Sequence, residues 1–252
     1  MRFLPLLLLP ALAFGGSLVN SVSSALKAQG DAPVVTIACC GAGRSAVPVV
    51  SEALGAPSSD VSVVSAPTPL ALVDVSGASD SDGTSAVAAA DVLALEVRFL
   101  DLVERSAHGL GQLLPMLQRS VRLRDLRPSP KLLLLTVTDF DKSEASEADV
   151  SAFVKAQLEE LVASLALPED AGSLSTADLL QHQCFFLPSK VAAPDAYAQG
   201  LETLRTALTT TDFRSAPASA VVACVSDAAE RSVSASQVRS SPSKGEACAR
   251  VR

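Results

Sequence analysis

The feature that most constrains the fold is a series of short apolar runs, each followed closely by a turn or a polar residue. The strongest is KLLLLTV, from Lys131 to Val137. An apolar run of about four to eight residues bounded by turn signals suits a buried strand better than a helix. We therefore predict strands at 34–37, 70–75, 92–97, 131–137 and 183–187.

Helical patterns lie between several of these runs. Apolar residues recur three and four positions apart over 110–121, 150–165 and 196–208, which is the spacing of one helix face. Acidic residues precede the second of these segments, where they suit a helix N-terminus. Strands that alternate with helices predict a three-layer α/β fold with a mostly parallel sheet, covered on both faces.

Composition excludes several kinds of partner and site. The 252 residues carry a formal net charge of −7 and no run of Lys or Arg, whereas a nucleic-acid surface needs clustered cations to neutralise phosphate. The five cysteines contain no CxxC pair, and His108 and His182, the two histidines, lie far apart in sequence. Neither a zinc site nor a disulfide framework is therefore predicted.

The N-terminus resembles a targeting segment. Arg2 precedes an apolar run over 3–14, which is shorter than the roughly 20 residues that span a bilayer. This favours a cleaved signal peptide, with an uncleaved membrane anchor as the alternative. The Ser-rich stretch that follows has the composition of a linker or transit peptide. We predict that 1–30 is a targeting segment and linker for the endoplasmic reticulum or secretory route, or for a plastid if both signals act together.

The C-terminal part has a different composition. Val221 to Val225 could form one further strand, but Ser, Ala and Arg dominate to the end of the chain. We therefore predict one α/β domain over 31–212 and a low-complexity, disordered tail over 213–252.

A glycine-containing turn follows the first predicted strand. The segment ACCGAGRS, Ala38 to Ser45, has the spacing of the phosphate-binding motif GxxxxGK[ST]. It retains Gly43 and Ser45, and Arg44 stands where the motif has Lys. In that motif backbone N–H groups hold phosphates and the hydroxyl binds Mg²⁺. Gly41 and Gly43 could equally form a simple tight turn.

Aspartates follow two later strands. DVSG, Asp74 to Gly77, comes at the end of the second predicted strand, and TDFDK places Asp139 at the end of the fourth. An Asp at either place could be a turn former or helix cap. A nucleoside triphosphate site on such a sheet, however, combines a phosphate loop, a metal-binding Asp and a base-reading Asp in this order.

From Leu70 to Leu208 the chain resembles the dynamin-like GTPases of the root-hair-defective-3, yeast Sey1-like and atlastin type, which fuse endoplasmic-reticulum membranes. PLALVDVSG is similar to that family's strand ending in DxEG. KLLLLTVTDFDK is similar to its strand ending in the Arg-Asp guanine reader. FFLPSK and the helix after it are similar to the closing strand, loop and helix of the same domain.

The resemblance implies a G domain that binds GTP or GDP with Mg²⁺. Gly41, Gly43, Arg44 and Ser45 would face the phosphates, and Ser45 would also bind Mg²⁺. It further implies Asp74 and Gly77 at the metal and γ-phosphate, Asp139 at the guanine edge, and a homodimer through the nucleotide face. The loop from Leu187 to Lys190 would close over the base.

Departures from the family pattern predict that hydrolysis is weak or lost. Arg44 replaces Lys, Ala38 replaces Gly, Thr138 replaces Arg and Ser76 replaces Glu. Only 14 residues separate Gly55 from Leu70, where the family has a long switch segment, and Thr68 is their one threonine. We therefore expect a degenerate G domain whose GTPase activity is uncertain. The alternative is a non-nucleotide α/β interaction or structural protein.

Overall fold

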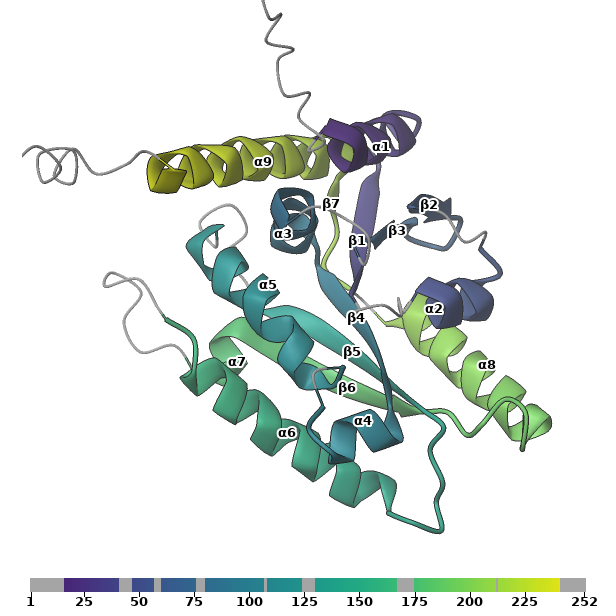
Figure 1. Ribbon diagram of the computed structural model, residues 1–252. Helices are drawn as coiled ribbons and strands as arrows, with labels where there is room; N and C mark the ends of the chain where they lie inside the picture. Colours follow the sequence, from purple (N-terminus) through teal and green to yellow (C-terminus); the bar gives the residue numbers. More distant parts are fainter. Residues whose placement is uncertain are drawn as a thin grey trace, which may run out of the picture.

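A computed structural model describes residues 16–40, 47–56, 60–75, 80–106, 108–123, 130–166, 175–211 and 213–240 (Figure 1). Its strands are β1 (Pro33–Cys40), β2 (Val61–Val64), β3 (Leu70–Asp74), β4 (Val92–Arg98), β5 (Lys131–Thr138), β6 (Leu180–Phe186) and β7 (Ala216–Pro217). Its α-helices are α1 (Gly16–Lys27), α2 (Val47–Leu54), α3 (Asp80–Ala89), α4 (Phe99–Val103), α5 (Leu113–Ser120), α6 (Glu147–Ala163), α7 (Thr176–Leu179), α8 (Pro194–Thr210) and α9 (Ala218–Ser240). Two 3₁₀ turns, η1 (Leu110–Gln112) and η2 (Val121–Leu123), flank α5.

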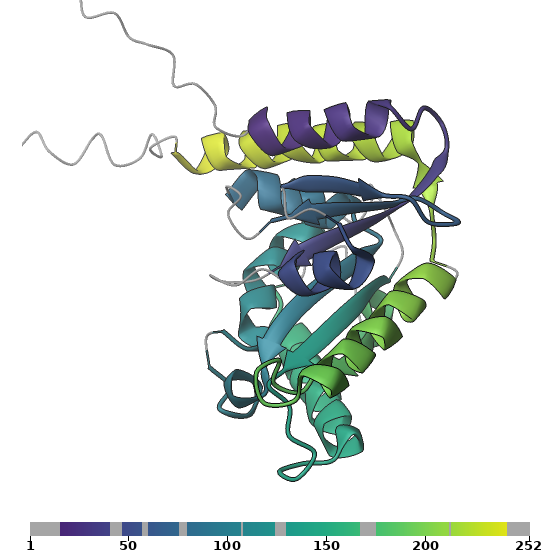
Figure 2. The same cartoon turned by 90° about the vertical axis from the view of Figure 1, so that its right-hand side faces the viewer.

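The strands form one sheet in the order β2-β3-β1-β4-β5-β6, and β7 pairs with the start of β1. The pairs among β3, β1, β4, β5 and β6 are parallel, whereas β2 and β7 run antiparallel to their neighbours. Helices cover both faces (Figures 1 and 2). The predicted three-layer α/β fold is therefore confirmed, and each of the five predicted strand runs overlaps a strand.

The central strands are apolar because both of their faces are covered. In β5, Leu133 and Leu135 contribute to the core on one face and Leu134 to the core on the other. Each is at most 2% exposed. The absence of polar alternation in KLLLLTV follows from this two-sided burial.

The three predicted helices are confirmed as α5, α6 and α8. Leu117, Leu158 and Leu204 represent their buried faces, each at most 2% exposed. The side chain of Ser146 caps the start of α6 by accepting a hydrogen bond from the Asp149 backbone N–H at 3.1 Å. This cap satisfies a backbone donor that lacks a partner within the helix.

The C-terminal segment differs from its prediction, because α9 occupies residues 218–240 that composition assigned to a disordered tail. Val221 and Val225 are 1% and 2% exposed and lie four residues apart, so this apolar run is helical and not a strand. Ala218 and Ala228 continue the same buried face. The small residues between them conceal the helical period in the sequence.

The stretch predicted to be a linker also differs, because residues 16–27 form α1. Its Leu18, Val22 and Leu26 recur every four residues and are at most 6% exposed. Figure 2 shows α1 and α9 running side by side over the sheet. The folded unit therefore extends beyond 31–212 at both ends. The apolar run over 3–14 lies outside the described residues, within which no helix is long and apolar enough to cross a membrane.

Further described elements, among them α2, β2 and α3, fall outside the strands and helices that the apolar patterns predict. Helix α2 follows the loop after β1 and holds Pro48 in its first turn, where a missing N–H is tolerated. The four residues of β2 occupy part of the short segment between Gly55 and Leu70. Helix α3, DSDGTSAVAA, is rich in small and polar residues and has no stripe of large apolar side chains.

Candidate functional site at the carboxyl edge of the sheet

The parallel strands β1, β3, β4, β5 and β6 all end at one edge of the sheet. The chain moves from β1 to β3 on one side of β1, and later from β3 to β4 on the other side. Such a reversal of strand order opens a crevice at the carboxyl ends of the strands, which is where open α/β sheets bind ligands. The loop 41–46, with Gly41, Gly43, Arg44 and Ser45, follows β1 here but lies outside the described residues, as does Gly77.

The end of β1 corrects one detail of the predicted phosphate loop. Ala38, matched to the first glycine of the motif, lies within the strand opposite Val73 of β3 and Leu93 of β4. The strand continues to Cys40. Turn geometry therefore begins at least two residues later than the motif requires, and the conformational freedom of a glycine is not needed at Ala38.

The two cysteines at the end of β1 are buried and poorly suited to act as nucleophiles. Cys39 and Cys40 are both 0% exposed. Burial, with a contribution from the nearby Asp74 carboxylate, raises the pKa of each thiol, for Cys40 to about 12. Both remain protonated at neutral pH, whereas a nucleophilic cysteine acts as the thiolate.

Asp74 is the last residue of β3, as the sequence predicted. It pairs in register with Cys39 and is half-buried, and its backbone N–H donates to the carbonyl of Asp60 at 2.8 Å. Its electrostatic effect on Cys39 and Cys40 places its carboxylate near the end of β1. Ser45, its predicted partner in binding a metal, lies outside the described residues. Within those residues no cluster of three or more His, Cys, Asp or Glu side chains could hold a metal ion.

Asp139 follows β5 in a left-handed backbone conformation, with φ at 54°. Asp tolerates this region better than most residues, but it still costs roughly 1–3 kcal/mol and such residues gather at functional sites. The Asp139 side chain is exposed and makes no hydrogen bond within the described part of the chain. The backbone directs this carboxylate toward solvent at the edge of the sheet.

The residue after Asp139 anchors this conformation. The Phe140 backbone N–H donates to the Leu187 carbonyl at 3.0 Å. Its buried ring packs edge-on against Phe99 at 5.3 Å and against Phe186 at 4.8 Å between ring centroids. Three strand ends thus fix the position from which Asp139 projects.

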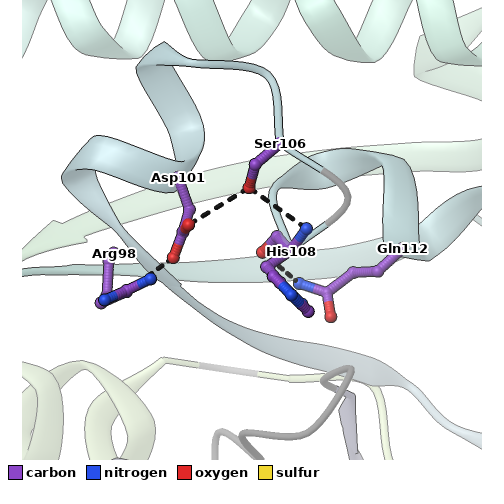
Figure 3. Close-up of polar contacts among 5 residues, drawn as sticks. All are labelled: Arg98, Asp101, Ser106, His108 and Gln112. Carbon is purple, nitrogen blue, oxygen red and sulfur yellow. Dashed lines mark hydrogen bonds and ion pairs between the residues drawn. The ribbon is translucent and has the colours of Figure 1, made fainter.

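Arg98 is a candidate binding residue that the sequence analysis missed. It ends β4, opposite Thr138 of β5, and its Nε donates to the Asp101 carboxylate at 2.6 Å (Figure 3). Ser106 Oγ donates to the same carboxylate at 3.2 Å. Asp101 and, more weakly, Asp139 raise the pKa of Arg98. A cation at the end of a central strand, one strand away from Asp139, is the signal that could have identified it.

The loop after β6 is held against α2. Lys190 Nζ lies 2.8 Å from the Glu52 carboxylate, and the Tyr197 hydroxyl donates to the same group at 3.2 Å. Burial and the negative charge of Glu52 raise the pKa of Tyr197 to about 12. The loop predicted to close over a base, Leu187 to Lys190, therefore spans from the Phe140 anchor to α2.

The two predicted aspartates lie too far apart to bind one small group. β1 and β4 separate β3 from β5, and at about 4.8 Å per strand spacing Asp74 and Asp139 are roughly 14 Å apart. Arg98 projects from β4 between them. This edge of the sheet can therefore contact both ends of an elongated ligand, and Arg98 supplies a positive charge between them.

Comparisons with known proteins give no family assignment. No family model matches the chain, and no curated protein matches it. Among solved structures it is similar to LeoA, a bacterial dynamin GTPase from ETEC, with a TM-score of 0.44 and 14% identity over 89% of this chain. It spans 42% of the length of LeoA. It is also similar to an NADPH-quinone reductase from P. pentosaceus, with a TM-score of 0.41 and 14% identity over 71% of this chain and 98% of that one.

Proposed function

We propose that the protein binds a guanine nucleotide at the carboxyl edge of its sheet, as a degenerate dynamin-like G domain whose hydrolysis is weak or lost. The observation that carries the proposal is Asp139, whose exposed carboxylate projects from a left-handed position at the end of β5. By the family resemblance, such a domain would serve endoplasmic-reticulum membrane organisation.

A carboxylate in this position favours guanine over adenine. An ionised carboxylate only accepts hydrogen bonds, and its two oxygens can accept from two adjacent donors. The guanine edge presents such a pair in N1–H and the C2 amino group. Adenine has an acceptor at N1 and no amino group at C2. Asp139 therefore supplies a reason for base selection.

The remaining edge residues suit the rest of a nucleotide. The planar guanidinium of Arg98 matches the geometry of phosphate oxygens. Asp74 supplies an oxygen ligand of the type that Mg²⁺ takes beside nucleotide phosphates, usually with only one or two carboxylates from the protein. Mg²⁺ would neutralise phosphate charge, and Ser45 would be its second protein ligand.

Weak or lost hydrolysis follows from two departures from the family pattern. Arg44 is bulkier than the motif's Lys and does not replace a compact ammonium between phosphates. Thr68, the one threonine of the short segment that the family devotes to its switch, lies in a bend just before β3. The neighbouring Pro69 carbonyl accepts a hydrogen bond from Val35 at the start of β1, so this bend is at the opposite edge of the sheet from the candidate site. Phosphoryl transfer depends on positioning and charge neutralisation, so both changes oppose it.

A second candidate function, a non-nucleotide α/β interaction or structural protein, is favoured by the continuation of β1 past Ala38. Under this alternative the glycines of 41–46 only turn the chain from β1 to α2, and Asp139 is a turn residue. The two candidates differ in whether any nucleotide stabilises the native protein.

The test is thermal melting of the full chain with Mg²⁺ and GTP, GDP, ATP or xanthosine triphosphate. A ligand at one hundred times its Kd adds about 2.7 kcal/mol, which is roughly 5–10 °C in Tm for a domain of this size. We expect this shift with GTP and GDP but not with ATP. Equal shifts with GTP and ATP would contradict the role of Asp139, and no shift with any nucleotide would support the second candidate.

The Asp139→Asn variant tests the contact itself. An amide N–H replaces one carboxylate acceptor, so it repels the guanine amino group but can donate to the C2 carbonyl of xanthine. We expect the GTP shift to fall and a shift with xanthosine triphosphate to appear. Glu159→Gln, the same chemical change on the exposed surface of α6, is the matched control and should behave like the parent.

A further inference from the structure

A groove runs along β6, the edge strand of the sheet. It is open to solvent, has a volume of about 1020 Å³, and lies between the segment that leads into α6 and the first half of α8. Its floor is formed by residues 183–186 of β6. Four residues of extended chain span about 13 Å, and the volume lies at the upper end of the range for ligand-binding clefts.

The hydrogen-bonding groups of β6 face this groove at alternate residues. The Leu187 backbone N–H donates to Val137 of β5 at 2.9 Å, which orients the odd-numbered residues of β6 toward β5. Successive residues of a strand point their N–H and C=O groups to opposite sides. Those of His182, Cys184 and Phe186 therefore point away from β5. Among the described strands none pairs with this side of β6.

The wall formed by α8 leaves room for another strand. Ala193, Ala196 and Gly200 line the groove at three- and four-residue spacing, so they form one face at the start of the helix. Ala193 and Ala196 carry only a methyl group beyond Cα, which keeps the groove wide at the start of α8, whereas Gly200 is packed directly against Leu187. Side chains of an inserted strand can therefore pack against the start of α8, beside Ala193 and Ala196, without displacing the helix.

The opposite rim is acidic. Asp139, Asp141, Glu144 and Glu147 line the groove, whereas Lys142 is the one cation among its lining residues and lies 2.8 Å from Glu147. We call these four carboxylates the acidic rim. Their excess negative charge favours a cationic ligand at this end of the groove.

We propose that β6 binds an extended, lysine- or arginine-containing segment of a partner protein, which adds to the sheet as a further strand. Strand addition obtains affinity from main-chain hydrogen bonds and specificity from alternate side chains. Here one side of the added strand packs against the small residues of α8, and its cations face the acidic rim. The groove shares Asp139 with the proposed nucleotide site, but this inference does not require that a nucleotide binds.

A second copy of this chain fits the groove less well than a basic segment. Two copies would pair identical β6 edges, and each molecule carries a formal net charge of −7. Like charges of this size oppose self-association. The acidic rim would gain no complementary cation from β6 of the other copy, whose sequence is LQHQCFF.

The probe is a fluorescein-labelled peptide, Lys-Val-Lys-Val-Thr-Val, titrated with the full chain and followed by fluorescence anisotropy. Two further peptides carry N-methyl groups on alternate residues, one on the valines and one on the other three positions, so that each lacks the N–H groups of one edge. A fourth peptide has Glu in place of Lys. We expect one methylated peptide and the Glu peptide to bind at least tenfold more weakly than the probe.

Two pairs of variants locate the site on the protein. Cys184→Pro removes an outward N–H at a place where an edge strand tolerates proline, and should weaken binding about fivefold relative to Cys184→Ala. Glu144→Gln should weaken it about threefold, whereas Glu159→Gln, on the exposed surface of α6, should not. Melting temperatures establish that each variant is folded.

The proposal is overturned if the probe does not bind, if both methylated peptides bind as well as the probe, or if the Glu peptide does. Equal affinity of Cys184→Pro and Cys184→Ala would also overturn it. Light scattering across the same concentration range tests the competing occupant, because a dimer that Cys184→Pro abolishes would assign this edge to a second copy. Nucleotide melting shifts are measured separately, so failure of one proposal leaves the other intact.

Discussion

The two faces of the sheet are covered by helices from different parts of the chain. One face is covered by α2 and α8, which pack on the smaller of the two main apolar clusters. On this side Glu52 of α2 contacts Lys190 and the Tyr197 hydroxyl. The other face is covered by α3, α5 and α6, and also by α1 and α9 from the two ends of the described chain (Figure 2). Each face supports part of the candidate site, the first through the contacts of Glu52 and the second through Phe140, which anchors Asp139. Only the second face also brings segments from the two ends of the described chain together.

This difference means that the protein cannot be reduced to its α/β centre. The buried face of α1 and that of α9 belong to the same apolar cluster as the central strands β4 and β5. Ala218 N–H donates to the Ala32 carbonyl at 3.1 Å, and Ser219 Oγ donates to Asp31 at 2.6 Å, so α9 starts directly beside the start of β1. The terminal helices complete one layer of the fold.

The largest expected effect is that of trimming the chain to residues 31–212. The deletion removes five large buried side chains, those of Leu18, Val22, Leu26, Val221 and Val225. At about 1.5–3 kcal/mol for each, the loss is roughly 10 kcal/mol, as large as the whole stability of a typical domain. We expect no cooperative melting transition for 31–212 by circular dichroism.

Residues 16–240 form the matched control, because they retain every described element. Cooperative melting of 31–212 within a few degrees of this control would show that the two faces are covered independently of the chain ends, and would remove the contrast between them.

A smaller effect is expected from opening a cavity on either face. Leu204 of α8 and Leu158 of α6 are each 0% exposed and lie on opposite sides of the sheet. Each Leu→Ala substitution should cost about 2–5 kcal/mol. Since the residues do not share a cluster, the double variant should cost the sum within about 0.5 kcal/mol. Urea unfolding of the four proteins measures this, and two separate transitions in any of them would show that the faces unfold independently.

A substitution at Gly200 tests how closely α8 lies against the sheet. A Cβ at Gly200 would collide with Leu187 Cδ2. Leu187 is 0% exposed, and backbone hydrogen bonds with Val137 and Phe140 hold it in place. The clash costs about 1–3 kcal/mol, and the higher helix propensity of alanine offsets up to about 1 kcal/mol.

We therefore expect Gly200→Ala to lower the free energy of unfolding by about 1–2 kcal/mol in urea titrations. A Cβ at Gly111 would meet nothing within 4 Å, so Gly111→Ala should be neutral. Equal stability of the two variants would mean that α8 can move away from β6 at little cost.

The elements that could be predicted each show a recognisable apolar pattern within their own sequence. The run KLLLLTV is apolar because β5 is central, and the long helices α6 and α8 repeat their apolar residues often enough to show a period. Asp74 and Asp139 could be placed because each directly follows a strong strand signal, and parallel strands end at one edge.

The parts that could not be predicted depend on neighbours far away in sequence. Helix α3 has no stripe of large apolar residues, and the role of its buried alanines becomes clear only when α9 is seen to pack against them. Helix α9 itself is rich in Ser and Ala and resembles a disordered tail in composition. Arg98 became a candidate only once β4 was known to lie beside β5, and the β6 groove is assembled from three separate segments of the chain.

The smallest effect concerns Asp101 of α4, the helix that directly follows β4 at the carboxyl edge of the sheet. The hydrogen bond from Arg98 above all, and that from Ser106, hold the pKa of Asp101 below its ordinary value, against the effect of burial. A carboxyl whose pKa is lower in the folded state stabilises that state above its unfolded pKa of about 3.9. The contribution is lost as the pH falls through the folded pKa.

We therefore expect urea titrations at pH 6 to show that Asp101→Asn costs about 1 kcal/mol, because the side chain of its partner Arg98 is 40% exposed and solvent weakens such ion pairs. At pH 3 and below the cost should shrink, because the parent carboxyl then becomes protonated as well. Glu159→Gln, on the exposed surface of α6, should show no such difference. An Asp101→Asn cost as large at pH 2 as at pH 6 would mean that Asp101 acts through packing and not through its charge. The edge contacts would then stabilise the protein by the same means as the two helical faces.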